Sequence, residues 1–106
     1  PAPITRAWVV VVEETAEAAG ERGRLFTDKA LRDYLTQKGW KLRVVDKDVR
    51  DSSGNPPADV KPYLERASGK KLPQVYVVDQ DGAVRHEGAL PLDPSDLLAL
   101  LKKIGG

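Results

Sequence analysis

The chain has 106 residues, of which 41% are hydrophobic and 31% charged, and its formal net charge is +1. This length predicts a single domain with its own hydrophobic core, and the absence of cysteine excludes disulfides, thiolate metal sites, iron–sulfur clusters and cysteine nucleophiles. The small net charge and the short apolar run at residues 7–12 predict no nucleic-acid partner and no membrane span, which needs about 20 apolar residues.

The two ends of the chain differ in composition from the rest. Residues 1–3, Pro-Ala-Pro, are expected to be the end of a linker or leader, because proline cannot donate to a strand ladder. We expect one domain over residues 4–104 and a C-terminal tail at 105–106. Since the chain also lacks methionine, we interpret it as a processed or excised part of a longer protein.

The first half of the chain predicts a strand, an ambiguous segment and a helix. Residues 4–12 form an apolar, β-branched run that is typical of a strand covered on both faces. Segment 13–23 fits either a loop or a broken helix, because glycines interrupt its alanines and glutamates. A helix is expected to begin at Thr27 or Asp28, whose side-chain oxygen can cap the first turn, and to end at Gly39.

The second half predicts a strand, a short helix, a hairpin and a closing helix. Residues 41–49 indicate a second strand, and after a loop rich in proline and glycine a short helix capped by Asp59 is expected. An Asp-Gln-Asp-Gly turn joins a third strand over 74–78 to a fourth over 83–88. Asp93 is expected to cap the last helix, with proline at its first position.

This order predicts an α/β fold of the type β-α-β-α-β-β-α, with a central mixed four-stranded sheet flanked by helices. We expect each of the first two helices to be a crossover between parallel strands. The fourth strand is then expected to be the one antiparallel strand, at an edge of the sheet. Trp8 and Trp40 are expected to pack in the core or at a helix end.

The predicted order, with Leu72-Pro73 directly before the hairpin, resembles the thioredoxin-like superfamily over the whole chain. Residues 71–88 follow the family pattern most closely, and residues 25–35 look like the group whose first helix is broken after its active site. The resemblance implies that the Leu72–Pro73 bond is cis. It also implies a Cys-x-x-Cys motif at 20–23 or 15–18, and neither segment contains cysteine. Thiol–disulfide exchange and peroxide reduction are therefore excluded.

The resemblance further implies a groove formed by the loop after the first strand, the segment around the cis-proline and the loop before the last helix. We expect this groove to bind a protein or an extended peptide segment by β-augmentation, without a cofactor. Lys70 and Lys71 can add attraction for an acidic segment. The candidate binding residues are Glu13, Glu14, Glu17, Arg22, Arg24, Lys71, Leu72, Pro73 and Gln74.

The expected function is therefore that of a redox-inactive, thioredoxin-like module for protein binding or assembly, and not an enzyme. An alternative is a non-thiol enzyme or a small-ligand-binding domain that uses Glu13, Glu14, Arg22 and Arg24 of the same groove, because paired carboxylates can serve as general acid and base. A third possibility is a structural spacer domain in a longer chain.

Two further groups of residues suggest metal binding only weakly. Aspartates 46, 48, 51, 79 and 81 offer oxygen ligands, but the turn around Asp79 explains two of them, and the chain has no twelve-residue calcium loop. His86 is the single histidine, and one imidazole without cysteine makes a poor metal site. We expect no metal and assign His86 a structural or solvent-facing role.

Overall fold

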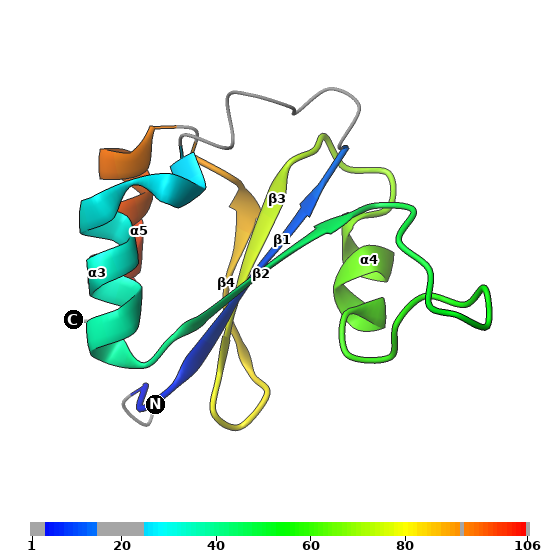
Figure 1. Cartoon of the computed structure of the whole chain (residues 1–106), viewed down its shortest axis with the longest axis horizontal. Coiled ribbons are helices and arrows are strands. Elements are labelled where there is room, and N and C mark those ends of the chain that lie inside the picture. Colours follow the sequence, from blue (N-terminus) through cyan, green and yellow to red (C-terminus); the bar gives the residue numbers. More distant parts are fainter. Residues whose placement is uncertain (1–3, 15–24, 92, 106) are drawn as a thin grey trace.

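The computed structural model describes residues 4–14, 25–91 and 93–105 (Figure 1). In this part of the chain the predicted order of four strands and three helices is confirmed. The elements are β1 (Ala7–Glu13), α3 (Lys29–Lys38), β2 (Lys41–Asp46), α4 (Lys61–Ala67), β3 (Gln74–Asp79), β4 (Val84–Ala89) and α5 (Pro94–Gly105).

The four strands form one mixed sheet in the order β2-β1-β3-β4. Strand β1 is parallel to β2, whereas β3 is antiparallel to both of its neighbours, β1 and β4. Three strands therefore share one direction, as expected, but the reversed strand is β3 inside the sheet. The prediction that β4 is the reversed strand is wrong, whereas its predicted position as an outer strand of the sheet is confirmed.

The reversal of β3 follows from the path between β2 and β3. Glu13 pairs with Asp46 and Val12 with Gln74, so β2 ends and β3 begins at the same edge of the sheet. Residues 47–60 lead away from this edge and α4 leads back to it (Figure 1). The chain thus runs along the sheet twice between β2 and β3, once in residues 47–60 and once in α4, whereas a single crossover was expected. β3 therefore starts at the edge where β2 ends and runs in the opposite direction. Here an edge means a border of the sheet at which its strands begin or end, and not an outer strand. We call the border at the ends of β1 and β2 the carboxyl edge, and the opposite border the amino edge.

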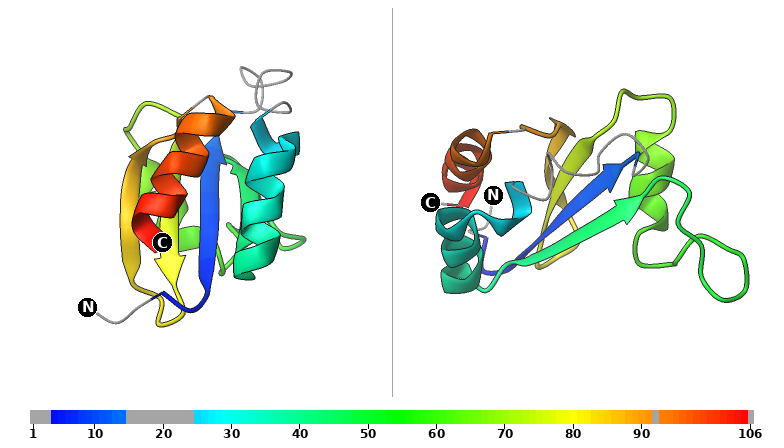
Figure 2. Two further views of the ribbon diagram at one scale, coloured as in Figure 1. Left: turned by 90° about the vertical axis from the view of Figure 1, so that its left-hand side faces the viewer. Right: turned by 45° about the horizontal axis from the view of Figure 1, so that its top comes forward.

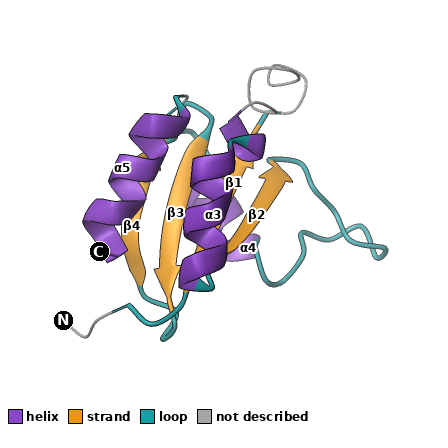
Figure 3. Cartoon of the chain, turned by 60° about the vertical axis from the view of Figure 1, so that its left-hand side comes forward, coloured by secondary structure: helices purple, strands orange, loops and turns teal. Residues whose placement is uncertain are grey.

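Helices cover both faces of the sheet, with α3 and α5 on one face and α4 on the other (Figures 2 and 3). In β1, Val9 and Val11 belong to the core on the side of α3 and α5, while Val10 and Val12 belong to the core on the side of α4. All four side chains are at most 1% exposed. The prediction of a first strand buried on both faces is confirmed.

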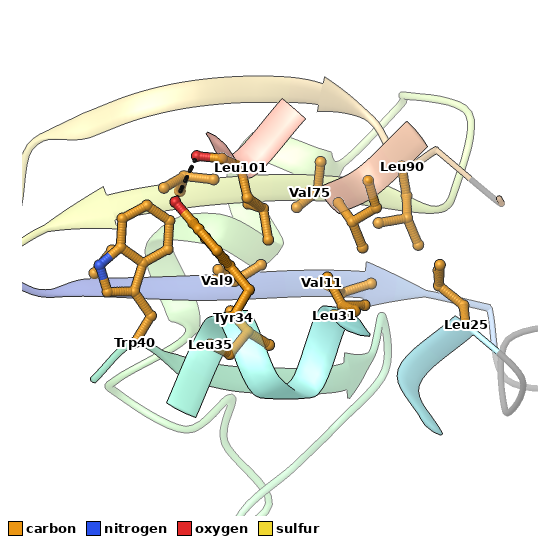
Figure 4. Close-up of a cluster of buried hydrophobic side chains, with 13 residues drawn as sticks. Val9, Val11, Leu25, Leu31, Tyr34, Leu35, Trp40, Val75, Leu90 and Leu101 are labelled. Atoms are coloured by element: carbon orange, nitrogen blue, oxygen red, sulfur yellow. Dashed lines mark hydrogen bonds between the residues drawn. The ribbon is translucent and has the colours of Figure 1, made fainter. Parts of the chain in front are cut away.

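The core under α3 and α5 is the larger one and includes leucines from both helices, among them Leu31, Leu97 and Leu101 (Figure 4). The Tyr34 hydroxyl donates a hydrogen bond of 3.4 Å to the backbone oxygen of Leu101 and thereby links the two helices. Trp40 packs edge-on against Tyr34, with ring centroids 5.8 Å apart. The expected core position of Trp40 is confirmed.

The ends of α3 and α5 follow the predicted capping. The Asp28 carboxylate accepts a hydrogen bond of 3.0 Å from the backbone N–H of Leu31, directly after a helical turn at residues 25–27. Gly39 ends α3 with φ at 69°, a conformation that glycine adopts without steric cost. Asp93 accepts from the backbone N–H of Ser95 at 2.8 Å.

Helix α4 is short and begins differently from the prediction. Val60 occupies its N-cap position without a side-chain cap, and Asp59 instead lies 3.8 Å from the guanidinium of Arg43. The helix has seven residues, against ten in α3 and twelve in α5. Since α4 is the one described helix on its face, it leaves both ends of that face less covered.

Candidate functional site

The carboxyl edge brings the predicted groove residues of β1 together with those before β3. Gln74 pairs with Val12, so residues 71–74 lie beside Glu13 and Glu14 at this edge. The Leu72–Pro73 bond is cis, as the resemblance implies. Three of the predicted residues lie outside the described part of the chain: Glu17, Arg22 and Arg24.

Hydrogen bonds on both sides hold the segment before β3 in place. The side-chain amide of Gln74 is buried and donates to the backbone oxygen of Lys71 at 2.7 Å. The backbone oxygen of Pro73 accepts from the N–H of Leu90 at 3.1 Å, which ties the segment to the chain after β4. The segment is therefore positioned before any ligand binds.

Leu72 differs from its neighbours in its backbone. Neither its N–H nor its C=O makes a hydrogen bond with any residue that the structure describes. Its side chain is half-buried and packs against the α4 core. Leu72 thus combines a backbone N–H and C=O that have no hydrogen-bond partner among the described residues with an apolar side chain held against the α4 core.

A pocket of about 380 Å³, which we call the Leu72 pocket, opens beside this residue at the C-terminal end of α4. Its apolar wall consists of Leu64, Ala67 and Leu72, and the backbone turn after α4 forms another side. Gly69 in this turn has φ at 79°. The full lining is Lys47, Asp48, Leu64, Ala67, Ser68, Gly69, Lys70 and Leu72.

The rim of the Leu72 pocket carries more basic than acidic groups. Lys47 lies 2.8 Å from the Glu14 carboxylate, and the hydrogen bond and charge of Glu14 raise the pKa of Lys47. Lys70 lies 3.8 Å from Glu87, which also binds Arg66 at 3.1 Å. Lys71 is exposed and has no ion-pair partner among the described residues.

The sequence prediction included residues 71–74 and the attraction of Lys70, but it missed Lys47, Asp48 and the turn after α4. A signal for Lys47 was present, because it directly follows a strand that is parallel to β1. Parallel strands end at the same edge of a sheet, and the backbone N–H of Lys47 donates to the oxygen of Glu13 at 2.8 Å. The approach of the α4 turn depends on tertiary packing.

The aspartates considered as metal ligands are divided between the two edges of the sheet. Asp46 ends β2 at the carboxyl edge, whereas Asp79 ends β3 at the amino edge and pairs with Ala7. The reversed direction of β3 is the reason for this separation. In the described part of the chain, no three acidic or histidine side chains are grouped in a way that could hold a metal ion.

Asp79 itself is used by the hairpin. One of its oxygens accepts from the backbone N–H groups of Asp81 at 2.9 Å and Ala83 at 3.0 Å, and the other accepts from Arg85 at 2.7 Å. The hydrogen bond from Arg85 is the largest effect that lowers the pKa of this carboxyl. The prediction that turn chemistry explains Asp79 is confirmed.

His86 is half-buried in β4, opposite Val77, on the side of the sheet covered by α3 and α5.

Among the helices that the structure describes, none has the length and apolar character needed to cross a membrane.

No protein-family model matches the chain, and no curated protein matches it at a significant level. The function of the chain must therefore be inferred from its own residues.

Proposed function

We propose that the chain is a redox-inactive, thioredoxin-like domain that binds an extended segment of another protein at the carboxyl edge. The order of helices and strands and the position of Leu72–Pro73 before the β3–β4 hairpin support the relationship. The absence of cysteine from the whole chain leaves no thiolate for redox chemistry.

The observation that carries the proposal is the backbone of Leu72, which is unpaired within the described residues and lies beside an apolar pocket. An extended peptide can pair with such a backbone while one of its alternate side chains enters the pocket. Leu64 and Ala67 form an apolar wall, which favours a branched aliphatic side chain such as valine.

The charge around the pocket favours an acidic peptide. Lys71 is exposed and has no ion-pair partner among the described residues, whereas Lys47 and Lys70 are paired with Glu14 and Glu87. Asp48 is the acidic residue in the pocket lining. Exposed charges contribute mainly to the rate and salt dependence of binding, so the contact is expected to weaken as the salt concentration rises.

A nuclear magnetic resonance titration tests the proposal with a short peptide of alternating valine and glutamate. We expect the largest amide shifts at Gly69, Lys71 and Leu72. The matched peptide with alternate backbone nitrogens methylated cannot form strand hydrogen bonds and should bind about tenfold more weakly or worse, since each lost bond costs about 1 kcal/mol. A valine–lysine peptide should also bind more weakly.

Substitutions locate the contact. Lys71→Glu is expected to weaken binding of the acidic peptide, whereas Lys102→Glu, on the exposed side of α5, is the matched charge control. Equal binding of the methylated peptide, or an equal effect of both substitutions, would contradict the proposal.

The alternative of a non-thiol enzyme in the same groove has less support. The Glu14 carboxylate is already paired with Lys47 at 2.8 Å, so a substrate would have to displace this lysine to reach it. Turnover of a substrate that is lost on Glu14→Gln, without a change in peptide binding, would favour this alternative.

A further inference from the structure

The amino edge of the sheet, opposite the Leu72 pocket, carries a second pocket on the α4 side. Its volume is about 410 Å³, which lies within the range of small-molecule sites, about 300–1,000 Å³. We call it the Trp8 pocket. Its lining includes Arg6, Trp8, Lys41, Tyr63, Val78 and Gly82.

The register of the sheet aligns the floor of the Trp8 pocket. Trp8 pairs with Lys41 on β2 and with Val78 on β3, so these three side chains lie in a row on the face that α4 covers. Tyr63 comes from the first turns of α4 and lines the pocket from above this row. Its ring packs against Tyr76 with centroids 5.6 Å apart, which fixes its position.

Aromatic groups in this pocket retain free hydrogen-bonding capacity. Trp8 is half-buried, so the expectation that it packs in the core holds for only part of its ring. Within the described residues, neither the indole N–H of Trp8 nor the hydroxyl of Tyr63 makes a hydrogen bond. Both rings can pack against a planar ligand, and both polar atoms are available to it.

The free charges of the pocket are positive. Arg6 and Lys41 are exposed, and neither has an ion-pair partner in the part of the chain that the structure describes. Asp79 also lines the pocket, but its carboxylate is buried and is already bound by Arg85 and two backbone N–H groups. The pocket therefore favours an acidic group, with which a guanidinium or ammonium forms charge-assisted hydrogen bonds.

We propose that the Trp8 pocket binds a small ligand that joins a planar aromatic ring to one acidic group. The ring lies against Trp8 and Tyr63, and the acid contacts Arg6 and Lys41. This site is separate from the proposed peptide contact, because the two pockets lie at opposite edges of the sheet and at opposite ends of α4.

Titration with naphthoate, followed by nuclear magnetic resonance and calorimetry, tests the ligand class. We expect shifts of the Trp8 indole signal and of the amides of Lys41 and Gly82. Naphthamide keeps the ring but lacks the charge, and cyclohexanecarboxylate keeps the charge but lacks the ring. Each should bind at least about tenfold more weakly, a difference of about 1.4 kcal/mol.

Charge substitutions test the assigned contacts. Arg6→Gln and Lys41→Gln should each weaken naphthoate binding several-fold with an unchanged melting temperature, and Lys102→Gln is the matched control. Two results would overturn the proposal. One is naphthoate and naphthamide binding with equal affinity, and the other is ligand shifts that centre on Leu72 instead of Trp8.

Discussion

The two faces of the sheet are built from alternate residues of the same strands, yet they differ in how completely they are covered. On one face, α3 and α5 lie side by side over the strands, and a tyrosine of one helix is hydrogen-bonded to the backbone of the other (Figures 3 and 4). On the other face, α4 has seven residues and is the one described helix. Both proposed sites lie on this second face.

The length of α4 accounts for the two pockets at its ends, whereas a third pocket, of about 330 Å³, lies beside α3 on the other face. A seven-residue helix is about 10 Å long, at 1.5 Å per residue, whereas the twelve residues of α5 span about 18 Å. The shorter helix covers the middle of its face and leaves the Trp8 pocket at one end and the Leu72 pocket at the other. The larger buried core lies on the α3 and α5 face, and binding is proposed on the α4 face.

Truncation of a leucine on each face tests this comparison most strongly. Leu101 of α5 is fully buried, and Leu101→Ala should lower the free energy of unfolding by about 3 kcal/mol. Leu64 is half-buried in α4, and Leu64→Ala should cost about 1 kcal/mol. Chemical denaturation measures both values. An equal loss of unfolding free energy in the two variants would contradict a larger contribution of the α3 and α5 face to stability.

The contact between α5 and Trp40 is expected to give the next largest effect. A Cβ atom on Gly105 would overlap the indole ring of Trp40, so Gly105→Ala should destabilise the protein by about 2 kcal/mol through overpacking. In a Trp40→Phe background the added methyl group has more room, and the penalty should be smaller. A penalty of the same size in both backgrounds would show that the contact does not restrict Gly105.

The cap of α3 should contribute less than these buried contacts. Asp28→Ala removes the acceptor for the N–H of Leu31 and should lower the free energy of unfolding by about 1 kcal/mol. Asp33→Ala on the same helix is the control, because its ion pair with Lys29 is largely exposed and should contribute little. The melting temperatures of the two variants should therefore differ.

The smallest expected effect depends on pH and concerns Asp79. Arg85 lowers its pKa in the folded state, so this carboxylate stabilises the fold above its unfolded pKa, about 3.9, and the contribution is lost as pH falls through the folded pKa. The stability difference between the protein and Asp79→Asn should be constant near neutral pH and shrink below about pH 4.

Asp81→Asn is the matched control for this measurement. Asp81 lies in the same turn, and its carboxylate has no ion-pair partner among the described residues. Denaturation curves at several pH values compare the two variants. A difference for Asp79→Asn that does not change with pH would contradict the role of the charged pair.

Most of the secondary structure could be predicted from the sequence alone. The β-branched run in β1, the cap at Asp28, the glycine after α3 and the Asp-Gln-Asp-Gly turn are local signals, because each acts through residues close together in the chain. The segment at residues 71–74 was also predicted, through its resemblance to a known pattern, as was the cis bond at Leu72–Pro73.

The tertiary structure alone decided the direction of β3, and with it the positions of both pockets. The sequence pattern of a strand is the same in either direction. Only the path of residues 47–60 and α4 therefore shows that Asp79 and Asp46 lie at opposite edges of the sheet. The same path brings Tyr63 over Trp8 and the turn after α4 beside Leu72. These contacts join residues far apart in the chain, and local sequence signals do not show which distant segments pack together.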